Sequence, residues 1–490
     1  MAKPERNELR ELAAQGFGMI PIGERLPLQG LTPARAFQIL KNLSRQCFIL
    51  ESAEDAGRYG RYTFLGYDPK LELSCRGGEM TIKSGAELRF ETRNPAEQIR
   101  RVLEESRAPR LDWLPPFSGG LVGYFSYDYI QYMEESLRFQ AGDEESFKDV
   151  DLMLFDKVIA FDHLENELIL IANARGDAPD ENYNRAIGEI AHMKSVLFEG
   201  KPAEIPPLRL KSDFHELFSE EEYCSMVERA KAYIREGDIF QVVLSNRLDA
   251  KAEGSLFETY RILRETNPSP YMFYFSSDDI EIAGAAPETL VKVSGDAVFT
   301  FPLAGTRPRG ATEEEDKALE EGLLRDEKEL AEHNMLVDLG RNDLGRVCRF
   351  GSVKLEKTLS IERFSHVMHI GSTVTGRLLG EKKAVDAVGA LLPAGTLSGA
   401  PKIRACEIID ELEGNRRGIY GGALGYLAFT GDMDLCIAIR LAFKKNGRVY
   451  LRSGAGIVAD SVPKSEYQEC VNKMRAVAEA LKKAEGRKSE

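Results

Sequence analysis

Short extended segments arrive in runs in this chain, and this order constrains the fold more than any other feature of the sequence. Between about Phe48 and Ile171, apolar stretches such as GRYTFLGY, GLVGYFSYD and LMLFDKVIAFD are separated by Gly, Asp and Pro. A second run, which includes QVVLSNRL, YMFYF and LVKVSG, follows later. Strands that arrive in runs favour layered antiparallel sheets over a doubly wound parallel sheet. The sequence therefore predicts an α+β fold, a layered sandwich of large antiparallel β-sheets flanked by helices.

The polar, proline-bearing stretch KPAEIPPLRLKSDF separates the two runs and is the predicted domain boundary. It divides the chain into a sheet-rich N-terminal region, 1–210, and a second region, 211–490. A helix is predicted soon after the boundary. Ser219 is its expected N-cap, Glu222 is the capping-box partner three residues on, and Gly237 follows the last turn.

Net charge limits the partners that this protein can bind over a wide surface. The 490 residues include 65 Lys and Arg against 79 Asp and Glu, which gives a formal net charge of -14. A broad nucleic-acid-binding face needs clustered Lys and Arg to displace counterions, and the basic clusters here are short. We therefore expect no nucleic-acid partner. An anion must be recognised locally, by an arginine, by backbone amides or by a bound cation.

Cysteine usage and the lack of long apolar runs predict a cytoplasmic protein. The seven cysteines show no C-x-x-C spacing, and their odd number indicates reduced thiols. The opening residues MAKPERNELRELAAQGF lack the apolar centre of a signal peptide. No uninterrupted apolar run reaches the ~18 residues that a membrane helix needs. We expect neither secretion nor a membrane span.

Two pairs of glutamates, each spaced three residues apart, are candidate metal ligands. Glu329 and Glu332 occur in RDEKELAEHNMLVDLGRND, and Glu466 and Glu469 occur in SEYQECVNKM, just after a proline at a predicted helix start. Each pair also fits a solvated helix face, and Glu469 could pair with Lys473. Four carboxylates brought together would repel strongly unless a cation lay among them. Oxygen-only ligands suit Mg²⁺.

Glycine-bearing loops and one arginine are candidate anion-binding features. PLAGTRPRG is a turn whose amides could bind an oxyanion beside Arg307 and Arg309, although an ordinary tight turn also explains it. SGAGIVAD follows the strand RVYLR, and its small residues let a ligand approach the backbone. Arg440 ends the apolar segment DLCIAIR, where a buried guanidinium needs a carboxylate. A protein salt bridge and a bound anion are both compatible with that position.

Many short motifs together carry a specific resemblance to a known family. They are FILES, PFSGGLVGYFSYD, GDIFQVVLSNR, NPSPYMFY, APETLVKV, PLAGTRPRG, DEKELAEHNMLVDLGRNDLGRV, FSHVMHI, PAGTLSGAPKIRACEIIDELE, RRGIYGGALGY, MDLCIAIR, GAGIVADSVP and EYQE. From about Phe48 to Met474 the chain resembles the large-subunit, or component I, anthranilate synthases of the chorismate-utilising enzyme family. The resemblance implies a lyase that converts chorismate and ammonia to anthranilate and pyruvate, the first committed step of tryptophan biosynthesis.

The resemblance also implies, residue by residue, a site for chorismate and Mg²⁺. The implied direct metal ligands are Glu332 and Glu469, with Glu329 and Glu466 supporting them. The residues that would bind the substrate are Tyr420 and Arg440, at the enolpyruvyl carboxylate, and Gly305, Thr306, Gly454, Ala455 and Gly456. A metal there would supply the local positive charge that an acidic protein otherwise lacks.

Two residues correspond to the catalytic groups of the family. Glu288 matches the general acid that protonates the departing C4 hydroxyl, a role that requires a raised pKa. His369 matches the histidine that assists the later elimination. Related aminodeoxychorismate synthases commonly carry Lys at the position of Ala304, and isochorismate or salicylate synthases carry a water-activating Lys at the position of Gln241. Both residues of this chain favour ammonia as the nucleophile.

Feedback regulation and a partner subunit are further implications of the resemblance. The residues that match the family's tryptophan pocket are Leu50, Glu51, Ser52, Pro270, Tyr271 and Met272. These residues could also serve only to bridge the two sheets. Ammonia from glutamine requires a Cys-His-Glu hydrolase, for which 490 residues leave no room. The expected partner is a separate glutamine amidotransferase subunit, component II, in a hetero-oligomer such as a heterotetramer.

Four residues depart from the family's pattern, and two other functions stay open. Asn246, Thr289, Gly371 and Cys470 are unexpected at their motif positions, and Cys470 directly follows an implied metal ligand. One alternative is component I of an aminodeoxychorismate synthase, in the folate pathway, with an unusual residue at position 304. The other is a non-catalytic, tryptophan-binding homologue. The complete set of implied glutamates, histidine and arginine argues against the second.

Overall fold

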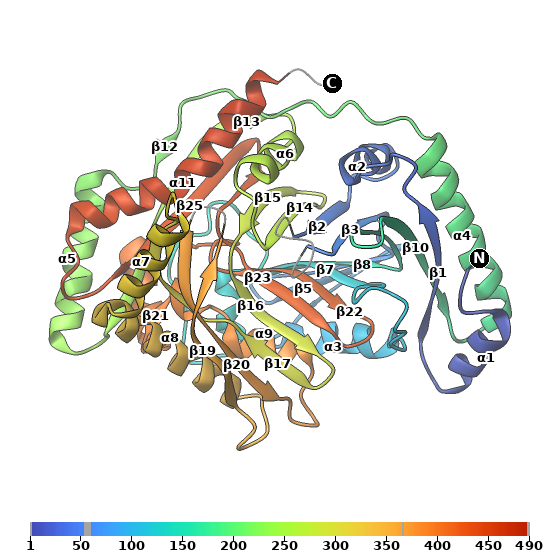
Figure 1. The fold of residues 1–490 in the computed structure, drawn as a ribbon, viewed down its shortest axis with the longest axis horizontal. Helices are drawn as coiled ribbons and strands as arrows, with labels where there is room; N and C mark the ends of the chain where they lie inside the picture. Colours follow the sequence, from blue (N-terminus) through green and yellow to red (C-terminus); the bar gives the residue numbers. More distant parts are fainter. Residues whose placement is uncertain (1, 53–59, 365–366, 488–490) are drawn as a thin grey trace.

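Two large β-sheets lie face to face and helices cover their outer faces (Figure 1). The computed structural model describes residues 2–52, 60–364 and 367–487. In these residues the strands that neighbour one another within each sheet pair antiparallel. This layered α+β sandwich confirms the predicted fold class.

The first sheet joins strands from both ends of the chain. Its order is β1 (Met19–Pro27), β10 (Glu167–Arg175), β9 (Lys157–Asp162), β3 (Tyr62–Tyr67), β2 (Cys47–Glu51), β14 (Tyr271–Ser276), β15 (Ile280–Ala286), β24 (Leu441–Lys445), β25 (Arg448–Ile457), β13 (Gln241–Glu253) and β11 (Arg209–Leu210). Two short strands, β12 (His215–Glu216) and β21 (Gly399–Ala400), also pair with β13.

The second sheet also joins strands from distant parts of the chain. Its order is β18 (Leu303–Pro308), β20 (Val367–Arg377), β17 (Ala297–Thr300), β16 (Thr289–Ser294), β23 (Met433–Ile437), β22 (Ala423–Ala428), β7 (Gly120–Phe125), β8 (Val150–Phe155), β4 (Leu71–Arg76), β5 (Glu79–Ser84) and β6 (Ala86–Glu91), and β19 (Lys354–Arg363) pairs with β20. Because both sheets draw strands from both sides of residue 210, the two-region division stays a prediction.

Helices flank the two sheets on different sides. Over the first sheet or at its end lie α1 (Arg6–Ala14), α2 (Pro33–Lys41), α4 (Pro179–Glu199), α5 (Glu220–Glu236), α6 (Phe257–Thr266), α10 (Lys402–Glu413) and α11 (Pro463–Gly486). Against the second lie α3 (Pro95–Glu105), α7 (Glu313–Leu324), α8 (Glu327–Gly345) and α9 (Ala384–Leu391). Two 3₁₀ turns, η1 (Tyr127–Tyr132) and η2 (Gly395–Leu397), complete the described elements.

Alternation of side chains along the strands builds separate apolar layers. Phe48 faces the core between the sheets, where it packs edge-on against Phe155 of the second sheet. The next residue, Ile49, points to the opposite face and joins the core beneath α2, α4 and α6. Successive side chains of a strand point to opposite faces, so each inner strand serves two cores. This requirement explains why the strands read as nearly continuous apolar runs.

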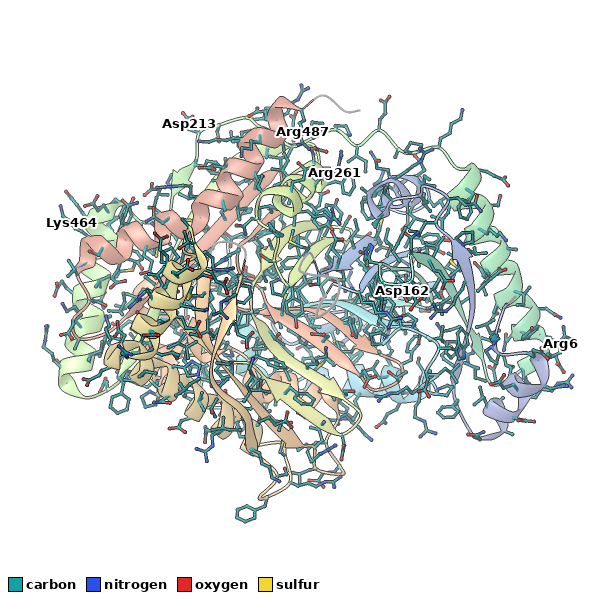
Figure 2. The ribbon with its side chains drawn as sticks, in the orientation of Figure 1. Arg6, Asp162, Asp213, Arg261, Lys464 and Arg487 are labelled. Carbon is teal, nitrogen blue, oxygen red and sulfur yellow. The ribbon has the colours of Figure 1, made fainter. Side chains whose placement is uncertain are left out.

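Two helices show what local sequence and tertiary packing each determine. Helix α5 confirms the predicted capping box between Ser219 and Glu222, and Gly237 ends it in a left-handed conformation (φ 87°). Helix α11 buries one face through Cys470, Met474, Val477, Ala480, Leu481 and Ala484. Figure 2 shows Lys464 and Arg487 at the two ends of this helix. Within the described residues, no helix is long and apolar enough to cross a membrane.

Candidate active site

Glu288 lies at the turn between β15 and β16, and burial keeps its carboxyl group partly protonated. Thr396, in η2, donates from Oγ1 to Glu288 Oε1 over 3.3 Å. Desolvation raises the pKa of Glu288 to about 7, against the opposing effects of the Thr396 hydrogen bond and the charges of Arg440 and Lys473. A carboxyl group that is partly protonated at neutral pH can act as a general acid there.

Arg440 is a half-buried cation that lies between the two candidate catalytic residues. Strand β23 ends at Ile437, so Arg440 occupies the connection to β24 and not the strand end that was expected. Its left-handed backbone (φ 51°) costs on the order of 1 kcal/mol for a residue with a Cβ. Among the described residues no carboxylate forms an ion pair with it, although it interacts electrostatically with Glu288 and His369. Its guanidinium is therefore available to a bound anion.

His369, on β20, is held as a neutral base. Its Nδ1 lies 2.7 Å from the carbonyl oxygen of Gly305 and 3.2 Å from Thr306 Oγ1. Because a carbonyl oxygen only accepts, Nδ1 carries the hydrogen and Nε2 keeps its lone pair. Burial lowers the pKa of His369 and the charge of Arg440 lowers it further, against the Gly305 hydrogen bond. The backbone at position 305 has a left-handed φ of 65°, a conformation that favours glycine.

Tyr420 and the glycines of β25 form another wall of the site. A Cβ on Gly454 would lie 2.7 Å from the carbonyl oxygen of Leu244 and 3.0 Å from the hydroxyl of Tyr420. A Cβ on Gly456 would lie 2.7 Å from Gln241 Nε2. No residue larger than glycine fits these two positions without a shift of its neighbours. Ala455, between them, points into the opposite core.

The two glutamate pairs face one another across the site, on α8 and α11. Burial raises the pKa of Glu332, and the nearby charges of Glu329 and Glu469 raise it further. Burial and the charge of Glu469 also raise the pKa of Glu466, which feels the charge of Lys328 on α8. Figure 1 shows α8 and α11 on the same side of the molecule. The sequence-predicted acids are thus brought together.

Lys473 is a cation of this acid cluster that the sequence suggested only as a simple pairing partner. Its Nζ lies 2.7 Å from Glu469 Oε1 and donates to the carbonyl oxygen of Gly454 over 2.9 Å. It also lowers the pKa values of Glu332 and Glu288 through its charge. One ammonium group therefore joins the acid cluster to the glycine wall of β25.

The donor set of this cluster fits Mg²⁺. All four groups are carboxylates, the ligand type that Mg²⁺ prefers. Burial is the main cause of the raised pKa of Glu332, and repulsion from Glu329 and Glu469, which a cation would relieve, adds to it. As the side chains stand, no three acidic, His or Cys groups of the described residues are close enough to hold one ion. Coordination by Glu332 and Glu469 would therefore require side-chain rotation, including release of Lys473 from Glu469.

The two residues that favour ammonia lie on opposite sides of the site. Gln241 begins β13, is 5% exposed, and its Oε1 has no hydrogen-bond partner in the part of the chain that the structure describes. A buried acceptor left without a donor costs about 1–3 kcal/mol. Ala304 is buried on β18 opposite Ile370, immediately before Gly305. A small apolar side chain there supplies no amine group, which related aminodeoxychorismate synthases commonly provide at this position through a Lys.

The six residues of the implied tryptophan pocket line one cavity of about 810 Å³. They come from β2 with the residue after it and from the start of β14 with the residue before it. Glu51 accepts from Arg264 Nε over 2.7 Å and from Thr63 Oγ1 over 3.1 Å, and Tyr260 also donates to it. The cavity extends to β18, β19 and β20, where its lining includes Arg309, Lys357 and Thr373.

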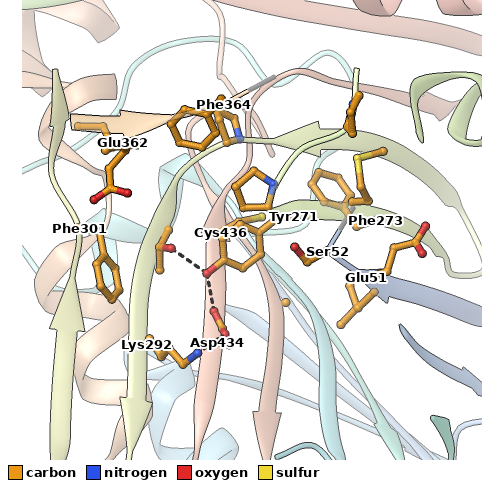
Figure 3. Close-up of a pocket in the computed structure, with 18 of the residues that line it drawn as sticks. Glu51, Ser52, Tyr271, Phe273, Lys292, Phe301, Glu362, Phe364, Asp434 and Cys436 are labelled. Atoms are coloured by element: carbon orange, nitrogen blue, oxygen red, sulfur yellow. Dashed lines mark hydrogen bonds and ion pairs between the residues drawn. The ribbon is translucent and has the colours of Figure 1, made fainter. Parts of the chain in front are cut away.

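Tyr271 connects this cavity to the strand that follows Glu288. Its hydroxyl lies 2.7 Å from Thr289 Oγ1 and donates to Asp434 Oδ1 over 2.7 Å (Figure 3). Thr289 begins β16 directly after Glu288, whose carbonyl oxygen accepts from the backbone N–H of Ile437. Tyr271 is therefore in hydrogen-bond contact with the residue that directly follows the candidate general acid.

Comparison with known proteins agrees with the predicted resemblance. Residues 45–479 match the model of the chorismate binding enzymes. The chain belongs to the chorismate binding enzyme family. It is 46% identical over 456 residues to anthranilate synthase component 1 of Thermus thermophilus, a match that covers 93% of this chain and 96% of that protein. It is 43% identical over 494 residues to the protein of the same name from Acetivibrio thermocellus, with 99% of each chain covered.

A solved structure supports the same family assignment. Anthranilate synthase component I from Streptococcus pneumoniae is 39% identical, and the superposition has a TM-score of 0.74 over 85% of this chain and 92% of that chain. Among the chorismate binding enzymes, the resemblance to anthranilate synthase component I that the sequence predicted is thus confirmed. The roles of individual site residues stay predictions.

The unexpected residues of this family member have simple structural settings. Asn246 bonds to the backbone of Phe218 through its side-chain oxygen (3.1 Å) and nitrogen (2.8 Å), which ties down the segment before α5. Cys470 points away from the acids, with its Sγ 3.1 Å from the hydroxyl of Tyr223 in a buried core. Thr289 bonds to Tyr271, and Gly371 lines the large cavity.

Thr396 is a site residue that the sequence did not single out. Its segment contributes to the resemblance only as part of the motif PAGTLSGAPKIRACEIIDELE. Its threonine is the hydrogen-bond donor to Glu288. The available signal was a hydroxyl side chain in a short loop with a glycine on either side. The signal is weak because threonine is common in loops for reasons of local hydrogen bonding.

Proposed function

We propose that this chain is the chorismate-converting component of an anthranilate synthase. It would catalyse the reaction of chorismate with ammonia to give anthranilate, pyruvate and water, the first committed step of tryptophan biosynthesis, in the cytoplasm. The observation that carries the proposal is Arg440, a half-buried guanidinium that forms no ion pair with a carboxylate of the described residues and interacts electrostatically with a protonatable Glu288 and a neutral His369. An anionic ring substrate supplies the carboxylate that this arginine lacks.

The first step joins nitrogen to the ring and removes the C4 hydroxyl. The lone pair of ammonia forms the C2–N bond, the two conjugated ring double bonds shift, and the C4–O bond breaks. The new ammonium group then gives up a proton to solvent. Glu288 in its protonated form donates to the departing oxygen, which leaves as water. Arg440 and Tyr420 hold the enolpyruvyl carboxylate, and the backbone at Gly305, Gly454 and Gly456 gives the ring room.

The second step makes the ring aromatic. The C2–H bond breaks as the C3–O bond to the enolpyruvyl group is cleaved, and the released enol takes up a proton to become pyruvate. His369 assists as a base through Nε2, since its Nδ1 hydrogen is directed to Gly305. No covalent intermediate with the protein is required.

The acid cluster would hold Mg²⁺ through Glu332 and Glu469, with support from Glu329 and Glu466. When bound, Mg²⁺ supplies neutralisation and orientation of the ring carboxylate. Lys473 is released from Glu469 in this arrangement and can direct its charge toward the same carboxylate. The chain's own contribution is the placement of these groups on two helices that face the site.

Ammonia would come from a separate glutamine amidotransferase, component II, in a hetero-oligomer such as a heterotetramer. The name component 1, which the relatives carry, supports a partner component. Within the described residues the Oε1 of Gln241 has no hydrogen-bond partner, so it is a suitable acceptor for an N–H of ammonia, and this amide cannot activate water as a Lys at the same position would. Ala304 supplies no amine group in place of ammonia. Ammonia is therefore the preferred nucleophile.

Tryptophan would inhibit the enzyme from the large cavity. Leu50, Glu51 and Ser52 on one side, and Pro270, Tyr271 and Met272 on the other, present apolar surface and hydrogen-bonding groups to an amphoteric aromatic ligand. The cavity is large enough for this ligand. The hydrogen bond between Tyr271 and Thr289 gives inhibition a physical route to Glu288.

One assay tests the activity. Purified protein is mixed with chorismate, ammonium and Mg²⁺, and the blue fluorescence of anthranilate is recorded. Fluorescence without any second enzyme supports the proposal. Accumulation of a 4-amino product would assign the chain to aminodeoxychorismate synthesis, and unchanged chorismate would indicate a non-catalytic homologue.

A further inference from the structure

A buried arginine outside the predicted site, Arg417, makes contact with three walls of that site. Its side chain is 1% exposed and donates to both carboxylate oxygens of Glu413, from Nε over 3.0 Å and from Nη2 over 2.5 Å. Its Nη1 donates to the carbonyl oxygen of Leu397, and its Nη2 to that of Val243, each over 2.6 Å. The guanidinium carbon also lies 5.8 Å from the centre of the Tyr420 ring.

Each contact reaches a segment that carries a residue of the site. Leu397 directly follows Thr396, the hydrogen-bond donor to Glu288. Val243 lies two residues after Gln241 on β13 and pairs with Gly456 of β25. One planar group therefore fixes the loop of the general acid and the strand opposite the glycine wall, and it packs against Tyr420.

The partner of Arg417 is itself fully occupied. Glu413 is buried, and its carboxylate also accepts from the backbone N–H of Ser245 (2.8 Å) and from Arg452 (2.8 Å). Withdrawal of both charges from water is costly, and apolar replacements of buried ion pairs are often neutral or stabilising. A stability role alone explains this pair poorly. The fixed fork geometry of arginine suits a role in holding segments at set positions.

We propose that Arg417, held by Glu413, is a positioning residue that sets Thr396, β13 and Tyr420 relative to one another for catalysis. It makes no contact with the reacting atoms and acts through these three neighbours. The inference rests on the proposed function, because the pair of Arg417 and Glu413 is given a role in that reaction. Arg417→Lys keeps the charge but cannot bond to Glu413, Leu397 and Val243 together. Arg417→Met removes both the charge and the hydrogen bonds.

The test compares Arg417→Lys and Arg417→Met with Arg247→Lys. Arg247 is a matched control because it is also a buried arginine, and its guanidinium pairs with Glu145 and Asp249. Among the described residues it makes no hydrogen bond to Glu413, Leu397 or Val243. For each protein, KM for chorismate is measured in the ammonia-dependent assay together with the pH above which activity falls at constant NH₃. Neither quantity depends on the fraction of protein that is folded.

We expect Arg417→Lys to raise KM by about tenfold or more, as a misplacement of about 1 Å can cost on the order of 10²-fold. The pH limit should move upward, because loss of the Thr396 hydrogen bond removes an effect that lowers the pKa of Glu288. Arg417→Met should show larger changes and Arg247→Lys neither. Unchanged KM and pH limit in both Arg417 variants would overturn the inference.

Calorimetric titration of chorismate into the same proteins separates this inference from the proposed function. A wild-type protein that binds chorismate but forms no anthranilate refutes the proposed function only. In that case tenfold weaker binding by Arg417→Lys still supports the positioning role. Equal binding by the wild type and both Arg417 variants refutes it.

Discussion

Burial of Glu288 should set the upper pH limit of the reaction. The general acid must carry a proton, and its pKa is raised to about 7, so activity is present below this pH and is lost as the pH rises through it. His369 must be neutral, and its lowered pKa keeps it so in the same range. The measurement is kcat/KM for chorismate against pH at a constant concentration of NH₃, because the ammonium pool itself titrates.

Glu288→Gln should lower turnover by on the order of 10²-fold to 10⁴-fold and abolish the pH limit. Its thermal unfolding should stay close to that of the wild type or shift upward, since the amide is not subject to the desolvation that opposes the charged carboxylate. An activity that rises steadily through neutral pH at constant NH₃ would contradict the role of Glu288.

Arg440→Lys should weaken chorismate binding while the protein stays folded. A lysine keeps the charge but lacks the planar fork that binds a carboxylate through two parallel hydrogen bonds. The expected rise in KM is roughly tenfold, the equivalent of about 1.4 kcal/mol. A KM equal to that of the wild type would show that the arginine does not bind substrate. Arg448→Lys, on the neighbouring strand and paired with Asp249, serves as the control.

At the residue scale the sequence predicted the chemical groups of the site better than their backbone conformations and contacts. Arg440 was predicted as a cation at a strand end, yet its left-handed backbone in the connection to β24 could not be read from DLCIAIR. Lys473 was noted only as a possible partner of Glu469. Its bond to the carbonyl oxygen of Gly454 depends on the approach of α11 to β25, which no local pattern specifies.

We expect bound Mg²⁺ to link helices α8 and α11 and so to stabilise the folded protein. Addition of Mg²⁺ should raise the melting temperature of the wild type, because ligands that bind only the folded state stabilise it. Chelation should abolish activity, and Mg²⁺ should restore it. In Glu332→Gln the melting temperature should not respond to Mg²⁺, and turnover should fall by on the order of 100-fold.

Glu327→Gln is the matched control for this prediction, because Glu327 is an exposed glutamate in the first turn of the same helix. It should respond to Mg²⁺ as the wild type does. Without metal, Glu332→Gln should be at least as stable as the wild type, since the amide removes repulsion from Glu329 and Glu469. A metal-dependent stabilisation that persists in Glu332→Gln would exclude Glu332 as a ligand.

At the scale of elements, patterns that depend on neighbours in sequence predicted the structure well. The capping box of α5 is complete in three residues, so Ser219 and Glu222 revealed it. The buried face of α11 depends on tertiary packing, because its last turns pack against α6, where Arg487 pairs with Glu258 and Glu265. The position of a partner helix determines which face is buried, and the sequence of α11 alone does not contain it.

Coupling between the large cavity and the site belongs to the whole molecule. Tyr271→Phe removes the hydroxyl that contacts Thr289 and Asp434 while it keeps the ring in the cavity. We expect the tryptophan concentration for half inhibition to rise by roughly fivefold or more, as loss of a buried hydrogen bond costs about 1–3 kcal/mol. The measurement is anthranilate formation against tryptophan concentration.

Tyr274→Phe is the control for this prediction. Tyr274 lies on the same strand but faces the opposite core, where its hydroxyl bonds to Glu281. Its loss should leave inhibition as in the wild type. Equal sensitivity to tryptophan in wild type and Tyr271→Phe would break the proposed route from Tyr271 to Glu288.

The fold class followed from strand runs, but strand order did not. The apolar strands of both runs predicted layered antiparallel sheets, as observed. Nothing in FILES or YMFYF indicates that β2 pairs with β14. Nothing in the sequences of β7 and β22 indicates that these two strands pair either, because apolar strands are compatible with many partners. The large cavity shares this origin, since it forms where these distant strands meet.

The pairing of β2 with β14, and of β7 with β22, means that neither sheet can close until late in synthesis. In a chain emerging from the ribosome, one backbone edge of β2 is unsatisfied until β14 has been made, and one edge of β7 until β22 has been made. Exposed edges of apolar strands are sites of self-association. Yield in a heterologous host should therefore respond more strongly to chaperone supply and growth temperature than the stability of the finished molecule would suggest.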